Sequence, residues 1–106
     1  MAQATLSTHV LDTTNGVPAA GVEVALYREG TLAAKGTTGK DGRLAKIGDA
    51  HEPGTYRLVF DVGAYFRSRQ LDTFLGSVSL EVRLAGGHQH IPLLVSRYGI
   101  VSYLGS

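Results

Sequence analysis

Hydrophobic and polar residues alternate with a period of two along much of this chain. Apolar side chains occupy every second position in three segments, residues 22–27, 56–62 and 78–84. A strand with this pattern buries one face and exposes the other. Turn-forming residues recur about every ten positions, as is typical of an antiparallel β-sandwich or barrel. The pattern therefore predicts an all-β fold.

Glycine, asparagine and proline mark the ends of these segments. The turn signals are Asn15-Gly16, Glu29-Gly30 and residues 39–42, 52–54 and 85–87, which offer the backbone angles that tight turns need. Residues 63–73 break the period of two, and we expect one short helix there, between two strands. No repeat, linker or low-complexity segment interrupts the sequence. Residues 1–106 are therefore expected to form a single domain.

The composition excludes several classes of protein. The chain has no cysteine, which rules out disulfides, thiolate metal sites and a cysteine nucleophile. The net charge is +1 and the cations are scattered along the chain, so we expect no nucleic-acid partner. The apolar runs are far shorter than the roughly 20 residues that span a bilayer, and residues 1–8 lack the regions of a signal peptide. We therefore expect no membrane association and a cytoplasmic location.

Histidine is the first candidate for chemistry, because an unperturbed pKa of roughly 6.5 lets it donate and accept protons near neutral pH. In residues 6–11 (LSTHVL), the period of two places His9 on the face opposite Leu6 and Val10. In residues 88–95, His88 and His90 share the face opposite the apolar positions. Two separate strands are thus expected to project imidazoles from their less apolar faces.

Pro92 lies on the same strand as two of these histidines. Proline lacks an amide hydrogen, so we expect this strand to be at a sheet edge or to contain a bulge. His51, in the turn-rich segment 49–54, is interpreted as a plain loop residue.

The residues alone leave three interpretations of the strand histidines open. Exposed histidines on a strand can simply be solvated. His88 and His90 could bind a metal ion together with His9, although the one acidic residue beside the two segments is Asp12, which follows the first. Alternatively, the imidazoles transfer protons in an enzyme, which is the interpretation that we favour.

Arg43 and the C-terminal segment are further candidates. Arg43 follows the turn at residues 41–42 and could begin a strand, where its guanidinium could bind a planar anion or carbonyl, although an ordinary surface arginine fits the same pattern. Tyr103 and the terminal carboxylate of Ser106 follow residues 100–102, a predicted short final strand. We expect that this end of the chain is needed for function.

The segments that contain these candidates resemble the 5-hydroxyisourate hydrolase family, the transthyretin-related enzymes of urate breakdown. The resemblance covers essentially the whole chain and rests on three segments in the family's order: residues 6–13 with 16–19, residues 41–43, and residues 88–106. It implies a transthyretin-like β-sandwich of two four-stranded sheets with one short helix. It also implies a homotetramer with active sites at the dimer–dimer interface, a small-molecule substrate and no cofactor.

The resemblance also implies roles for individual residues. The implied catalytic residues are His9, Arg43, His90 and Ser106, the implied substrate-binding residues are Arg43, Tyr103, Gly105 and Ser106, and no metal is implied. The chain departs from the family's usual terminal Tyr-Arg-Gly-Ser, because Leu104 takes the place of the arginine. If that arginine positions the substrate, turnover is lowered here; if it holds subunits together, Leu104 can substitute through apolar contact. Arg97, where the family commonly has proline, is a lesser change.

The implied reaction opens a cyclic amide, so the site must activate water, stabilise an oxyanion and protonate the departing nitrogen. We expect one of His9 and His90 to be the general base while the other orients the water or supplies a proton, and Arg43 to hold the ring. The alternative is a transthyretin-like carrier that binds a small hydrophobic ligand in the intersubunit channel without chemistry. The leucine at position 104 favours the carrier slightly, whereas the histidine motifs and Tyr103, whose bulk would narrow the channel, weigh against it.

Overall fold

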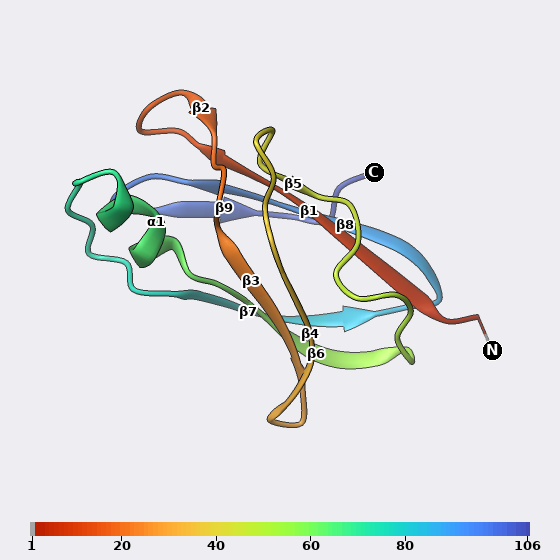
Figure 1. Ribbon diagram of the computed structural model, residues 1–106. Coiled ribbons are helices and arrows are strands. Elements are labelled where there is room, and N and C mark those ends of the chain that lie inside the picture. The colour runs from red at the N-terminus through yellow and green to blue at the C-terminus, as the bar shows by residue number, and fades with distance from the viewer. Residues whose placement is uncertain (1) are drawn as a thin grey trace.

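Two β-sheets pack face to face in the computed structural model, which describes residues 2–106 (Figure 1). The first sheet has the order β2 (Val17–Pro18), β1 (Ala4–Asp12), β8 (Gly87–Val95) and β9 (Ile100–Ser102), and β5 (Arg43–Leu44) also pairs with β1. The second has the order β4 (Thr31–Thr37), β3 (Glu23–Arg28), β6 (Gly54–Phe60) and β7 (Val78–Leu84). With the helix α1 (Val62–Ser68), this confirms the predicted transthyretin-like sandwich of two four-stranded sheets, to which β5 is an addition.

One strand pairing departs from the predicted antiparallel sandwich. Strands β1 and β8 run parallel, with Ser7 opposite His90 and His9 opposite Pro92, whereas the other pairings between the described strands are antiparallel. A parallel pair needs a long connection, and here residues 13–86 lie between its two strands. The pairing therefore brings the first and last histidine segments side by side.

The inner faces of the two sheets form the core. Leu6 and Val10 of β1, Leu58 and Phe60 of β6, and Leu93 of β8 are at most 1% exposed. They occupy the alternate positions that the period of two assigned to the buried face. The histidines of β1 and β8 consequently point away from the core.

Helix α1 begins earlier than the sequence pattern predicted. Val62 continues the alternation of β6 but belongs to the helix, because the carboxylate of Asp61 accepts a hydrogen bond from the amide of Ala64 (3.1 Å) and caps its first turn. Tyr65 and Phe66 are buried against the sandwich. Within residues 2–106, no helix has both the length and the apolar character needed to cross a bilayer.

The expectation that Pro92 marks an edge strand or a bulge is wrong. Strand β8 lies between β1 and β9, and Pro92 is buried. Pairing with the C-terminal segment occurs at Leu93 with Ser102 and again at His90 with Gly105. Pro92 lies between these two points, so its missing amide hydrogen falls where the pairing is interrupted.

His51 is not the plain loop residue that we expected. It is 9% exposed, its backbone pairs with Ala4 in an isolated bridge, and its Nε2–H donates to the carbonyl of Ile47 (2.7 Å). The backbone bridge therefore joins the loop after β5 to the start of β1, and the side chain closes that loop on itself. The bridge could not be predicted from the sequence, because Ala4 and His51 are far apart in the chain.

Strand β4 was not predicted either. Most of its residues are exposed, and it lies at the edge of the second sheet. Burial of one face is what produces alternation of apolar and polar residues, so a mostly exposed edge strand gives little signal.

A buried network attaches α1 to the end of β1. The Tyr65 hydroxyl donates to Oδ2 of Asp12 (2.7 Å), and the backbone and side-chain amides of Asn15 donate to the same carboxylate (3.0 and 2.7 Å). Burial opposes ionisation of Asp12, but these hydrogen bonds outweigh it and lower the pKa of the carboxyl group. Burial, together with the bond to Asp12, raises the pKa of Tyr65 to about 12.

We expect the free energy of unfolding to fall as the pH rises from 10 to 12. Tyrosine in the unfolded chain ionises near 10, whereas Tyr65 in the folded chain ionises at about 12. The stabilisation is therefore fully present below pH 10 and is lost as the pH passes through 12, a change of about 2–3 kcal/mol. Urea unfolding across this range measures it. Tyr65→Phe should remove that part of the alkaline loss, and an equal loss in both proteins would contradict the assignment.

Candidate active site

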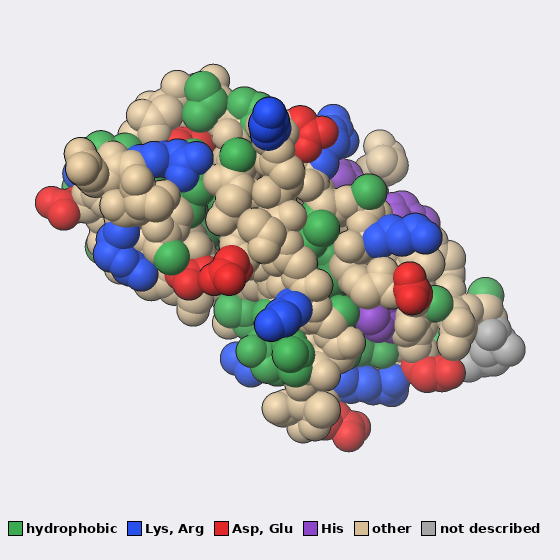
Figure 2. All heavy atoms as spheres, in the orientation of Figure 1, with side chains coloured by type: hydrophobic (Ala, Val, Ile, Leu, Met, Phe, Trp, Pro, Cys, Tyr) green, Lys and Arg blue, Asp and Glu red, His purple; other side chains and the backbone are tan. Residues whose placement is uncertain are grey.

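A row of ionisable side chains crosses the outer face of the first sheet. Arg43 of β5 pairs directly with His9 of β1, and on the other side of β1 Ser7 pairs with His90 of β8. Neighbouring strands lie about 4.8 Å apart and two residues advance about 6.6 Å, so the Cα atoms of His9 and His90 are roughly 8 Å apart. One small molecule can contact both imidazoles. Figure 2 shows histidine side chains reaching the surface beside Lys and Arg side chains.

The turn before β5 holds Arg43 and His9 together. Gly42 has a φ of +77°, and a Cβ there would lie 2.4 Å from the carbonyl oxygen of Val10, so glycine alone lets the turn approach β1 so closely. The amide of Val10 donates to the carbonyl of Gly42 (2.8 Å). The carboxylate of Asp41 accepts from the amide of Arg43 (2.9 Å) and lies 3.9 Å from its guanidinium. The guanidinium is thereby held at the end of the row.

The tautomer of His9 follows from its hydrogen bond. Its Nε2 lies 2.8 Å from the backbone carbonyl oxygen of Asp41. A carbonyl oxygen can only accept, so Nε2 carries a hydrogen. When the ring is neutral, Nδ1 of His9 is therefore its proton-accepting nitrogen.

Hydroxyl groups of β1 link the two histidines of β8. The Ser7 hydroxyl lies 2.8 Å from Nδ1 of His90 and 2.9 Å from Nε2 of His88, and the Thr5 hydroxyl lies 2.7 Å from Nδ1 of His88. These contacts form a continuous hydrogen-bond chain from half-buried Thr5 and exposed His88 to half-buried His90. Since Nδ1 of His90 is occupied, Nε2 is the ring nitrogen that it offers to a ligand.

The surroundings of His90 favour its neutral form. Burial lowers the pKa of the imidazole, and the nearby charges of Arg43, His9 and His88 lower it further. These are the side chains expected around it if the row forms one site. His90 is consequently a neutral base at pH values where an ordinary histidine begins to protonate.

The C-terminal segment lies beside His90. The amide of Gly105 donates to the carbonyl of His90 (2.7 Å), and this pairing continues the register that joins Leu93 to Ser102. The same register places Tyr103 opposite Pro92, on the face that carries the histidines, and Leu104 on the opposite face. Ser106 follows Gly105 and is exposed.

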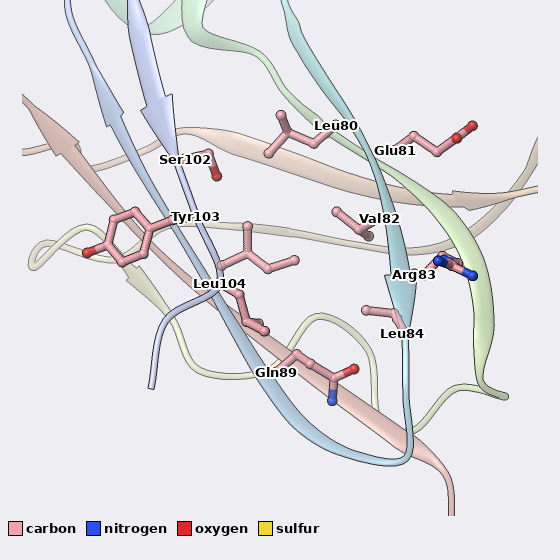
Figure 3. A pocket seen from close by; sticks show the side chains of 10 residues that line it. Leu80, Glu81, Val82, Arg83, Leu84, Gln89, Ser102, Tyr103 and Leu104 are labelled. Carbon is pink, nitrogen blue, oxygen red and sulfur yellow. The ribbon is translucent and has the colours of Figure 1, made fainter.

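Leu104 lines a separate apolar pocket of about 340 Å³ at the edge of the sandwich (Figure 3). Ile91, which alternates with His90 along β8, also lines it, so the pocket opens on the face away from the imidazoles. The facing apolar side chains come from β7 and are Leu80, Val82 and Leu84. In Figure 3 the Tyr103 side chain points away from β7. Leu104, at the position where the resemblance implies an arginine, therefore lies at this edge and not in the histidine row.

The geometry does not favour the metal site that His9, His88 and His90 suggested. Both ring nitrogens of His88 contact hydroxyl groups. Among residues 2–106, no group of three or more His, Cys, Asp or Glu side chains could hold a metal ion.

The structure brings together most of the residues that the sequence singled out. His9, Arg43, His90 and Gly105 lie across adjacent segments of one sheet face. The sequence did not single out the Thr5 and Ser7 side chains, and it indicated His88 only as a strand histidine and possible metal ligand. A signal was present, since hydroxyl residues alternate with apolar ones before His9, but their partners could not be known without the strand register.

Comparisons with known proteins agree with this arrangement. The family model described as the HIUase/Transthyretin family matches residues 6–105. A 5-hydroxyisourate hydrolase of Salmonella typhimurium is 41% identical over 109 residues, which cover 95% of this chain and 80% of that protein.

Solved structures share the fold. The structure of Klebsiella pneumoniae 5-hydroxyisourate hydrolase matches with a TM-score of 0.93 at 35% identity, over 97% of this chain and 99% of that chain. Transthyretin from Sparus aurata matches with a TM-score of 0.86 at 24% identity, over 94% of this chain and 95% of that chain, a similarity of fold alone. Because the family model spans nearly all of the sequence, this chain belongs to the HIUase/transthyretin family.

Proposed function

We propose that this chain hydrolyses 5-hydroxyisourate by opening its cyclic amide, a reaction of urate breakdown. The observation that carries the proposal is the row in which Arg43, His9 and His90 share one sheet face. The site offers a guanidinium, Nδ1 of His9 and Nε2 of His90 to a ligand. These groups suit a flat, polar ring better than an apolar ligand. The name of the Salmonella relative supports the same substrate.

The reaction needs a base, an acid and a stabilised oxyanion. His9 offers Nδ1 and His90 offers Nε2, so one can accept a proton from water while the other orients the water or supplies a proton to the departing ring nitrogen. A positioned proton-transfer group contributes roughly 10²–10⁴-fold. Arg43 holds the planar ring and stabilises the negative charge that develops on the attacked carbonyl oxygen. The C-terminal segment forms one side of the substrate site, through Tyr103, Gly105 and Ser106.

We further propose that the chain assembles as a homotetramer, with each site closed by a neighbouring subunit. Strands β7 and β9 are the edges of their sheets, and an unpaired edge is a ready surface for association. Val101, Tyr103 and Leu104 are 58%, 56% and 72% exposed next to these edges. The histidine row lies on an open sheet face, where a facing subunit would exclude water and strengthen its electrostatic interactions. Light scattering coupled to gel filtration measures the assembly.

The decisive assay follows 5-hydroxyisourate generated fresh from urate by a urate oxidase. We expect the purified chain to accelerate its decay over the spontaneous rate at neutral pH, in proportion to protein concentration. Heat-unfolded protein is the control. No acceleration would overturn the proposed function and leave the carrier, which binding of small hydrophobic ligands would then test.

Gly105 allows a test of how closely the C-terminal segment must approach His90. A Cβ at this position would lie 2.9 Å from Cδ2 and 3.1 Å from the carbonyl oxygen of His90. Gly105→Ala should therefore displace the imidazole and lower kcat by about tenfold or more, with little change in Tm. Gly99→Ala is the matched control, since its nearest contact would be Oγ of Ser96 at 3.8 Å. Equal activity of the two variants would argue against a positional role for Gly105.

A further inference from the structure

We propose that Ser7 and His88 are positioning residues that relay protons between His90 and solvent through the chain Thr5, His88, Ser7, His90. The inference rests on the proposed function, in which His90 reacts through Nε2. It adds two groups, a serine hydroxyl and a second imidazole, that act on the reaction through His90.

The single hydroxyl hydrogen of Ser7 couples the protonation of the two imidazoles. Its hydroxyl lies within hydrogen-bond distance of Nε2 of His88 and Nδ1 of His90, but it has a single hydrogen to donate. It therefore donates to one ring and accepts from the other. With both rings neutral, a hydrogen on Nδ1 of His90 requires an Nε2 without hydrogen on His88. Equally, a hydrogen on Nε2 of His88 requires an Nδ1 without hydrogen on His90.

Two arrangements of the chain follow from this constraint. In the first, His90 donates from Nδ1 to Ser7, Ser7 donates to His88, and His88 donates from Nδ1 to Thr5, so Nε2 of His90 is a bare base. In the second, every hydrogen bond is reversed and Nε2 of His90 carries a hydrogen. The same imidazole is thus a base in one arrangement and an acid in the other, and it is neutral in both.

A balanced shift of protons converts the first arrangement into the second. Water loses a proton to Nε2 of His90 while its oxygen bonds to the substrate carbonyl carbon. His90 passes its Nδ1 proton to Ser7, Ser7 passes its own to Nε2 of His88, and His88 passes its Nδ1 proton to Thr5. Thr5 releases its hydroxyl proton to solvent. Nε2 of His90 then gives its proton to the departing ring nitrogen of the substrate as the amide C–N bond breaks. The hydrogen-bond chain returns to the first arrangement by taking a proton from solvent at Thr5.

The positions of these groups suit such a relay. His88 is exposed and Thr5 is partly exposed, so this end of the hydrogen-bond chain reaches solvent, whereas Ser7 is 8% exposed and His90 is half-buried. Arg43, His9 and His88 all disfavour a charged His90. A path that removes the second proton lets His90 accept one without becoming an imidazolium ion beside them.

Kinetics of Ser7→Ala and His88→Gln test the relay. We expect each variant to lower kcat by about tenfold or more, because the tautomer of a catalytic histidine depends on the bond at its other nitrogen, and to leave KM within about twofold. In mixtures of H₂O and D₂O, a plot of kcat against the D₂O fraction should be curved for the unaltered protein, because several protons move in one step. The plot should be linear for both variants. Added imidazole should restore part of kcat to His88→Ala, because His88 is exposed and free imidazole can reach its place.

A matched control and a second measurement keep the test decisive. Thr13→Val removes a hydroxyl that bridges the same two strands at their other end, where it donates to the carbonyl of Val95 (3.2 Å), and should keep kcat within about twofold. Nitrogen-15 NMR gives a readout independent of turnover. His88→Gln should change the ¹⁵N shifts of the His90 ring when Ser7 is present, but not in Ser7→Ala.

The outcomes separate this inference from the proposed function. If the unaltered chain does not accelerate decay of 5-hydroxyisourate, the proposed function fails, while the NMR coupling still reports on the hydrogen-bonded chain. If the unaltered chain is active but Ser7→Ala and His88→Gln keep kcat within twofold and the isotope dependence unchanged, the relay is wrong. Should Ser7→Ala fail to fold, His88→Gln alone decides, because its side chain lies at the exposed end.

Discussion

Replacing His90 by glutamine is expected to lower kcat by about 10²–10⁴-fold while the fold is retained. The glutamine side chain can still hydrogen-bond to the Ser7 hydroxyl, which lies 2.8 Å from Nδ1 of His90, but it cannot accept or donate a proton near neutral pH. Steady-state kinetics on freshly generated 5-hydroxyisourate measure the loss, and circular dichroism checks the fold. The pKa of His90 is lowered by burial and by nearby cations, so its base form persists below pH 6.5. The acid limb of kcat/KM in the unaltered chain should therefore lie below about 6.5.

His51→Gln is the matched control for this variant. His51 lies outside the row, and its Nε2–H donates to the carbonyl of Ile47. Its loss should lower Tm, because the loop after β5 loses a buried hydrogen bond, but turnover per folded molecule should be unchanged. Unchanged turnover in His90→Gln would remove His90 from the mechanism. Loss of turnover in both variants would point to a general effect of histidine loss on the fold.

The second large effect is expected for Arg43→Gln, with a fall in kcat/KM of about 10²–10³-fold. The guanidinium lies beside His9 at the end of the row, where it can hold a planar ring and stabilise an oxyanion. Arg43→Lys should recover part of the loss, since lysine keeps the charge but lacks the bidentate donor geometry. The charge of Arg43 also contributes to the lowered pKa of His90. In Arg43→Gln the acid limb of kcat/KM should therefore move to higher pH.

Arg57→Gln is the control for Arg43. Arg57 is exposed on β6 of the second sheet, with its guanidinium 4.9 Å from the ring centroid of Tyr27, and it carries the same charge away from the histidines. Its kinetics and pH profile should match those of the unaltered chain. If the two arginine variants behave alike, or if the acid limb of Arg43→Gln stays in place, Arg43 does not act in the row.

Several features of the site could be predicted from residues alone. Alternation placed His9, His88 and His90 on the less apolar faces of two strands, and the structure confirms both faces. The turn at residues 41–42 indicated a strand that begins at Arg43, and β5 begins there. These predictions succeeded because they depend on local backbone geometry, which the order of residue types expresses directly.

Other features could not be predicted in this way. Pro92 suggested an edge strand, but β8 is central and the missing amide falls where pairing with the C-terminal segment is interrupted. Val62 suggested a longer strand, but the Asp61 cap begins a helix there. His51 suggested a loop, but its partners lie in β1 and near β5. For Pro92 and His51 the deciding pairing is with a distant segment, and at Val62 a local helix cap overrides the alternation.

By itself the sequence determined which side chains each strand buries and which it presents, because burial of apolar area requires one consistent face per strand. Three segments in a fixed order also identified the family. Only the tertiary structure decided that β1 and β8 run parallel in the register that sets Ser7 against His90. A shift of that register by one residue would turn every side chain of one strand to the other face. The hydroxyl–imidazole chain, and the separation of Leu104 from the histidines, are set by this register and by its continuation to Gly105.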